Sequence, residues 1–92
     1  MRIDLRRQRV YRGADEVELS QKEYALLAFL VEHAGRAVSR QLLSDHVWGA
    51  GANGESRSLD VHIHWLREKV EADAASPQHI KTVRGVGYRF EP

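Results

Sequence analysis

The chain has 92 residues, no cysteine and a formal net charge of +1, since 14 Lys and Arg nearly balance 13 Asp and Glu. This length allows one domain with a modest core. The lack of cysteine excludes a disulfide framework, a thiolate nucleophile and a Cys-based zinc site. The longest apolar run, residues 24–31, is far too short to span a bilayer, and no signal-peptide pattern follows Met1. We therefore expect a cytoplasmic protein without a membrane partner.

Charge is segregated along the chain. Residues 1–13 hold five Arg and one Asp, residues 14–24 hold four acidic side chains and one Lys, and residues 77–92 hold three basic side chains and one Glu. Such segregation suits a nucleic-acid binder, but an ordinary solvated surface can show it too. By itself it is a weak indication of function.

Three short strands are predicted at the start of the chain. Residues 2–5, 8–11 and 16–19 are rich in β-forming side chains, and Gly13 marks a turn between the second and third segments. Charged residues at alternate positions indicate an antiparallel sheet with one face in water.

A core helix is predicted next. Ser20 and Glu23 have the spacing of a capping box, in which each side chain accepts from the backbone N–H of the other residue. The apolar run that follows is too wide for one stripe, so this helix should be packed on more than one side, with Tyr24 and Phe29 in or beside the core. We expect it to end at Gly35, which can adopt a left-handed conformation at low cost.

A second helix should follow a brief extended link at residues 37–38. Ser39 is its predicted N-cap, and the helix should run to Trp48. Residues 49–54 contain three glycines, which predicts a mobile surface loop. The segment has no Lys-Ser/Thr after it and no strand before it, so it is not a phosphate-binding loop.

The third helix, residues 57–70, separates its side chains into two faces. The face that should be buried carries Leu59, Ile63, Leu66 and Val70. The outward face carries Arg57, Val61, His64, Trp65 and Glu68, with His62 and Arg67 on the flanks. A guanidinium, two imidazoles and an indole are unusual on a solvent face, and they favour a surface that lies in a groove.

A closing hairpin is predicted from residues 80–83 and 88–90, with its tip at residues 84–87. The predicted order is three strands, three helices and a two-stranded ribbon. This order indicates an α+β winged helix-turn-helix fold, with an N-terminal antiparallel sheet of about three strands and a C-terminal β-hairpin wing.

Five blocks of residues carry a resemblance to a known family: Leu19-Ser20-x-x-Glu23-Tyr24-x-Leu26-Leu27, Gly35-Arg36-x-Val38-Ser39-Arg40-x-x-Leu43, Val47-Trp48-Gly49, Arg57-x-Leu59-Asp60-Val61-His62-Ile63-x-x-Leu66-Arg67, and Ile80-x-Thr82-Val83-Arg84-Gly85-x-Gly87-Tyr88. In order and spacing, over residues 16–91, they resemble the OmpR/PhoB-type output domain of bacterial response regulators. The resemblance implies that residues 1–92 form one DNA-binding domain. It also implies that the first strand of the family's N-terminal sheet is missing and that the phosphorylatable receiver domain is absent.

The function implied by this resemblance is sequence-specific binding of double-stranded DNA by the output domain of a two-component transcription regulator. The implied DNA site is a pair of tandem direct repeats. RNA polymerase is a further expected partner, through the loop at residues 49–56, and an N-terminal receiver domain is expected in the full-length protein. No cofactor is implied.

The resemblance also assigns roles to residues of the third helix and of the wing. The recognition helix, residues 57–72, should lie in the major groove. Phosphate contacts are implied for Arg57, His62 and Arg67, and for the indole N–H of Trp48, which should also pack at the rim of the core. Wing contacts near the DNA backbone are implied for Thr82 and Tyr88, with Tyr88 partly in the core, and Arg84 should enter the minor groove. From chemistry alone, the helix residues could equally be a solvated surface.

Two residues depart from the family pattern. His64 and Trp65 stand where many relatives carry arginines, and Trp65 cannot make the bidentate contact of arginine to guanine. Our hypothesis is that Trp65 and Val61 read thymine methyls or sugar edges by apolar contact, or that Trp65 is buried in a protein interface instead. Glu68 could pair with His64 or accept from a cytosine amino group.

Two other classes of function compete with DNA binding. A protein-interaction module would use the same Val61 and Trp65. An enzyme is poorly supported, because His62 and His64 are two residues apart and diverge on a helix, which makes a poor metal site. No serine lies in a nucleophile-elbow sequence. The sequence therefore predicts no catalytic residue, metal or cofactor.

Overall fold

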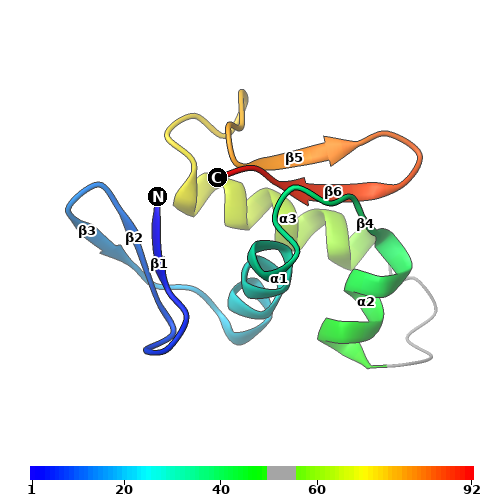
Figure 1. Cartoon of the computed structure of the whole chain (residues 1–92), viewed down its shortest axis with the longest axis horizontal. Helices are drawn as coiled ribbons and strands as arrows, with labels where there is room; N and C mark the ends of the chain where they lie inside the picture. Colours follow the sequence, from blue (N-terminus) through cyan, green and yellow to red (C-terminus); the bar gives the residue numbers. More distant parts are fainter. Residues whose placement is uncertain (50–55) are drawn as a thin grey trace.

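The computed structural model describes residues 1–49 and 56–92. Its elements in chain order are β1 (Arg2–Asp4), β2 (Arg9–Arg12), β3 (Asp15–Val17), α1 (Gln21–Glu32), β4 (Val38–Ser39), α2 (Arg40–Trp48), α3 (Ser56–Val70), β5 (Ile80–Val83) and β6 (Gly87–Phe90). The predicted glycine-rich loop falls mostly on residues 50–55, outside the described residues. In Figure 1 the N-terminal sheet, β1–β3, lies to the left of the helices, and β5 and β6 run above them.

The N-terminal sheet has the three antiparallel strands that the sequence predicts, in the order β1-β2-β3. Val10 pairs with Ile3 on one side and Val17 on the other, and its side chain is in the core. The third strand ends at Val17, two residues before the predicted end. Arg12 joins this sheet to the end of α3, because its Nη1 donates to the carbonyl oxygens of residues 68 and 71, each at 3.4 Å.

Helix α1 begins at the predicted capping box. The Ser20 hydroxyl accepts from the Glu23 N–H at 3.1 Å, and the Glu23 carboxylate accepts from the Ser20 N–H at 2.8 Å. The helix ends at Glu32 rather than at Gly35. Gly35 has the expected positive φ, +83°, and its N–H donates to the carbonyl of Phe90 at 2.9 Å, so it turns the chain towards β6 after the helix has ended.

The predicted C-terminal hairpin is present as β5 and β6, and a third short strand extends it into a sheet with the order β4-β6-β5. The segment predicted as an extended link is a short strand, in which Val38 pairs with Tyr88 and Ser39 with Gly87. A Cβ atom at Gly87 would collide with the Val38 carbonyl oxygen and lie 2.9 Å from the Arg40 nitrogen. Glycine is therefore required there for the close approach of β4.

The core lies where α1, α3 and the two sheets meet. As predicted, one face of α3 is buried, with Leu59, Ile63, Leu66 and Val70 each at most 1% exposed. These side chains pack in one cluster with Val10, Leu26, Leu27, Leu30, Val38, Leu43, Ile80, Tyr88 and Phe90. Among the described residues, no helix is long and apolar enough to span a membrane.

Candidate nucleic-acid interface

The outward face of α3 is exposed where the sequence predicts it. Val61 is 41% exposed and Trp65 is 47% exposed, one helical turn apart. His64 and Glu68 are also exposed on this face, with Nε2 of His64 3.5 Å from Oε1 of Glu68. The predicted pairing of these two side chains is therefore present in the structure. Arg57 lies in the first turn of α3, but its side chain is outside the described part of the chain.

Three aromatic rings meet at the edge of this face. The His62 ring lies 5.1 Å from the ring of Trp48, edge-on, and 5.2 Å from that of Trp65. Nδ1 of His62 is 2.7 Å from the Ser58 carbonyl oxygen. A carbonyl can only accept a hydrogen bond, so Nδ1 carries the hydrogen and the ring orientation is fixed. We call Trp48, His62 and Trp65 the aromatic cluster.

Lys22 of α1 lies beside the aromatic cluster, with Nζ 5.7 Å from the centre of the Trp48 ring. This is within the range of a cation–π contact. Lys22 was not among the site residues predicted from the sequence. Only the packing of α1 against the end of α2 brings it there, so no local sequence signal could have identified it.

Arg67 connects α3 to the wing. Its Nε and Nη2 donate to the carbonyl oxygen of Ile80 at 3.0 and 2.8 Å, and Nη2 also donates to the Thr82 hydroxyl at 2.8 Å. The guanidinium carbon is 5.5 Å from the centre of the Tyr88 ring. The planar fork of donors therefore fixes β5 relative to α3, in addition to the phosphate contact expected from the sequence.

Asp60 joins three elements at a single carboxylate oxygen. Its Oδ1 accepts from Nη1 of Arg40 at 2.8 Å and from the Tyr88 hydroxyl at 2.6 Å. The hydrogen bond from Arg40, aided by that from Tyr88, lowers the pKa of Asp60 despite partial burial. Burial and the Asp60 carboxylate raise the pKa of Tyr88, so its hydroxyl remains a donor at neutral pH. Tyr88, only 5% exposed, is mainly a core residue.

The wing presents Arg84 at its tip. The N–H of Val86 donates to the carbonyl of Val83 at 3.0 Å, which closes a four-residue turn, and Gly85 in that turn has φ +77°. A positive φ at the third position is typical of a type II turn, which glycine adopts without strain. The side chains of Arg84 and Thr82 are both exposed.

The wing is anchored at its start by Glu71. This carboxylate, 2% exposed, accepts from the N–H groups of Gln78, His79 and Ile80 at 2.7–3.3 Å. Nothing in the sequence predicted this role for Glu71. A carboxylate followed by a turn does not by itself indicate that its oxygens cap the next strand.

The structure therefore places the predicted site residues in two groups. Val61, His64 and Trp65 are exposed on one face of α3, with His62 and Trp48 beside them. Thr82 and Arg84 are exposed on the wing, which Arg67 and Tyr88 attach to α3. Arg40 and Asp60 were not predicted as site residues, because their contacts depend on the fold.

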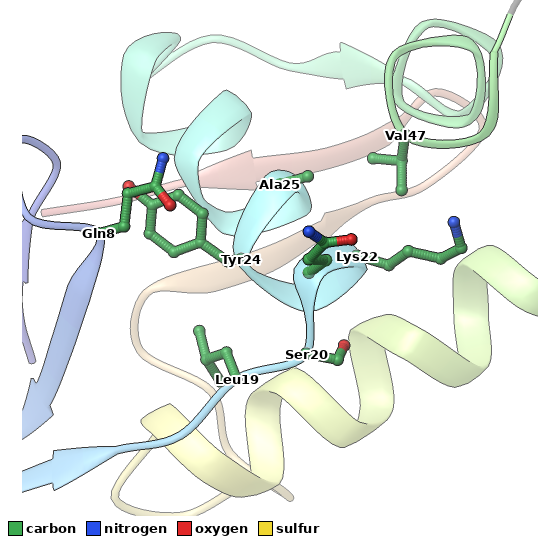
Figure 2. A pocket seen from close by; sticks show the side chains of 8 residues that line it. Gln8, Leu19, Ser20, Lys22, Tyr24, Ala25 and Val47 are labelled. Carbon is green, nitrogen blue, oxygen red and sulfur yellow. The ribbon is translucent and has the colours of Figure 1, made fainter.

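A pocket of about 440 Å³ lies elsewhere, between the start of α1, the end of α2 and the β1–β2 turn. In Figure 2, Gln8, Tyr24 and Val47 surround it, while the Lys22 side chain extends towards one edge. Among the described residues that line the pocket, Lys22 alone is charged, so they do not form a catalytic group of acids and bases. Within the described residues, no cluster of three His, Cys, Asp or Glu could hold a metal ion.

A helix pair in which the second helix exposes a polar and aromatic face, followed by a β-hairpin wing, defines a winged-helix DNA-binding protein. Residues 14–90 match the family described as "Transcriptional regulatory protein, C terminal". The chain belongs to this family, the OmpR/PhoB-type DNA-binding domains of bacterial response regulators. These domains act in transcription and are not enzymes.

Relatives of known identity support this assignment. The chain is 45% identical over 91 residues to the sensory transduction protein RegX3 of Mycobacterium tuberculosis, covering 99% of the chain and 40% of RegX3. It is 43% identical over 81 residues to the alkaline phosphatase synthesis transcriptional regulatory protein PhoP of Bacillus subtilis, covering 88% of the chain and 34% of PhoP. The chain thus spans less than half the length of these relatives.

Solved structures agree with the sequence relatives. The DNA-binding domain of Klebsiella pneumoniae RstA, in complex with RstA box, superposes with a TM-score of 0.86 at 39% identity, covering 98% of this chain and 89% of RstA's. The response regulator DrrB of Thermotoga maritima, an OmpR/PhoB homolog, gives a TM-score of 0.88 at 34% identity, covering 98% of this chain and 41% of DrrB's.

Proposed function

We propose that the chain binds specific sequences in double-stranded DNA, with α3 in the major groove and Arg84 of the wing in the minor groove. The observation that carries this proposal is the pairing of two exposed surfaces. The face of α3 around Trp65 and the wing tip around Arg84 belong to elements that Arg67 and the Asp60–Tyr88 contact hold together. Such a unit can lie in one groove and reach into the next.

Phosphate contacts are proposed for side chains at the border of these surfaces. His62 and Trp48 belong to the aromatic cluster, and the Trp48 indole carries an N–H donor. Arg57 lies in the first turn of α3, and Thr82 is exposed on β5. Arg67 and Tyr88 already donate hydrogen bonds to other groups of the protein. We therefore assign them mainly to the orientation of the wing and treat any phosphate contact as secondary.

The proposal extends to the full-length protein and its partners. Because the chain spans 40% of RegX3, we propose that residues 1–92 are the DNA-binding domain of a longer cytoplasmic regulator with an N-terminal receiver domain. Binding to tandem direct repeats and contact with RNA polymerase through residues 49–56 are proposed from the family resemblance.

The decisive experiment is fluorescence anisotropy with random-sequence duplex DNA at several salt concentrations, using the wild type and Arg84→Ala. We expect affinity to fall steeply with salt, because phosphate contacts release counterions. Arg84→Ala should reduce the log–log slope by about one unit. Arg6→Ala, which removes an exposed arginine from the β1–β2 turn at the other end of the molecule, is the matched control. Salt-independent binding, or equal slopes for Arg84→Ala and the wild type, would contradict the proposed groove contacts.

A further inference from the structure

We propose that Trp65 reads the C5-methyl group of thymine in the major groove, and that His62 and Trp48 are positioning residues for its indole. The inference rests on the proposed DNA-binding function and specifies which base feature the chain recognises. Trp65 stands where many relatives carry an arginine. Its contact with a base must therefore differ from the bidentate hydrogen bonding of arginine to guanine.

The first support is the exposure of apolar surface on the reading face. Among the described residues, five large apolar side chains are substantially exposed, and Val61 and Trp65 are two of them. They are four residues apart on α3, so they lie on the same face, one turn above the other. Together they form a small apolar strip on the outward face of α3.

The second support is that the indole is held before any ligand binds. His62 packs against Trp65 at 5.2 Å and against Trp48 at 5.1 Å, and its own orientation is fixed by the Ser58 carbonyl at 2.7 Å. Trp48 is in turn half-buried against the core, with the Lys22 ammonium group 5.7 Å from the centre of its ring. A side chain that is already ordered loses less conformational entropy on binding, which favours its use as a recognition contact.

The third support is the chemistry of the face, which is unsuited to guanine. Guanine presents two acceptors, O6 and N7, in the major groove, and an indole has only one N–H donor. One turn further, Glu68 also presents acceptor oxygens, and its nearest partner on this face is His64 at 3.5 Å. Thymine differs from the other bases in its methyl group, which an apolar strip can contact directly.

A protein partner is the less favoured occupant of the strip. Stable protein interfaces bury roughly 800 Å² on each partner, and here two apolar side chains are bordered by the polar His64 and the acidic Glu68 and Asp60. The family membership of the chain also favours DNA as the occupant of this face.

The test begins by selecting a preferred duplex from a random library with the wild-type chain. Each thymine of that duplex is then replaced in turn by deoxyuridine, which removes only the C5-methyl group. We expect at least one position at which wild-type affinity falls about fourfold, the equivalent of one buried methyl group. Trp65→Ala should bind the thymine and uracil duplexes equally. Leu42→Ala, which removes an exposed leucine from α2, is the control and should keep the wild-type discrimination.

The positioning role of His62 and Trp48 is tested by a separate measurement. The chain has two tryptophans, Trp48 and Trp65, and both belong to the aromatic cluster, so the readout is the intrinsic tryptophan fluorescence of the wild-type protein. This emission should change on binding the thymine duplex and change less with uracil at the contact position. His62→Ala should reduce thymine–uracil discrimination more than it reduces affinity for random DNA, because the indole loses its support.

The outcomes separate the two proposals. If the wild type binds DNA but tolerates uracil at every position, the thymine contact is wrong and the DNA-binding function stands. The thymine contact is equally wrong if Trp65→Ala discriminates as well as the wild type. If the wild type selects no duplex and binds none at low salt, the proposed function itself fails, and the inference fails with it.

Discussion

The hydroxyl of Tyr88 lies 2.6 Å from Oδ1 of Asp60 and donates a hydrogen bond that joins β6 of the wing to α3. Arg40, at the start of α2, donates to the same oxygen at 2.8 Å. One carboxylate oxygen thus fixes three elements that must keep a set geometry if the helix and wing are to contact DNA together. The ring of Tyr88 is buried, so its hydroxyl can be removed without exposing the core.

Tyr88→Phe should therefore lower the free energy of unfolding by about 1–2 kcal/mol, since it removes a hydrogen bond to a charged group and keeps the ring. Urea denaturation would measure the change. Tyr11→Phe is the matched control, because it also removes one hydroxyl and keeps the ring against Arg2. A Tyr88→Phe variant as stable as the Tyr11→Phe variant would show that the hydrogen bond contributes little.

Acid should destabilise the protein partly through Glu23. Burial alone would raise the pKa of this carboxyl, but hydrogen bonds from Lys69 and Ser20 outweigh burial and hold the pKa below its ordinary value of 4.5. The folded state then takes up a proton less readily than the unfolded state. The resulting stabilisation is present above pH 4.5 and is lost as the pH falls through the lower folded-state value.

Replacing Glu23 by Gln should lower stability at neutral pH and flatten the loss of stability below pH 4.5. The measurement is thermal denaturation from pH 7 to pH 3. Glu18→Gln, which neutralises an exposed carboxylate just before α1, should leave the acid dependence close to that of the wild type. An unchanged acid profile in Glu23→Gln would assign the pH dependence to other carboxylates.

Sequence patterns predicted those parts of the fold that depend on neighbours in the chain. The capping box of Ser20 and Glu23 and the buried stripe of α3 are set by spacings of three and four residues, and both are confirmed. Strand β4 was not predicted as a strand, because it has two residues and its partner is fifty positions away at Tyr88. No local pattern marks so short a strand.

The same distinction applies to the candidate site. The pairing of His64 with Glu68 was predicted from their spacing on one helix and is present at 3.5 Å. The contact of Arg67 with Ile80, and the position of Lys22 beside Trp48, depend on how separate elements pack. The sequence therefore indicated which side chains are outward on α3, but it could not indicate which of them also brace the wing.

Gly87 should be the least replaceable glycine of the wing. An added Cβ would meet the backbone of β4, which cannot move aside without breaking the pairing of Ser39 with Gly87. Gly87→Ala should therefore cost about 2–3 kcal/mol or more in unfolding free energy. Gly85→Ala has open space around the new methyl group and a positive φ, so it should cost about 1 kcal/mol. Equal losses for the two variants would contradict the close approach of β4.

Variants of Arg67 can separate its role in bracing the wing from the effect of its positive charge on DNA binding. Its guanidinium spans the Ile80 carbonyl and the Thr82 hydroxyl with two nitrogens, a geometry that the single ammonium of lysine cannot reproduce. Arg67→Lys should keep the salt slope of DNA binding near the wild-type value, because the positive charge remains. The same variant should lose about 1 kcal/mol of stability, and amide exchange in β5 should become faster as the strand loosens.

Arg67→Met completes the comparison, because it removes the charge together with the fork of donors. If bracing is the main role, Arg67→Met and Arg67→Lys should lose similar stability and show similar loosening of β5. If Arg67 acts mainly as a phosphate contact, Arg67→Lys should be as stable as the wild type, and only Arg67→Met should reduce the salt slope, by about one unit. The two hydrogen bonds to Ile80 at 2.8 and 3.0 Å favour bracing, because an arginine held in this way has only part of its donor set left for DNA.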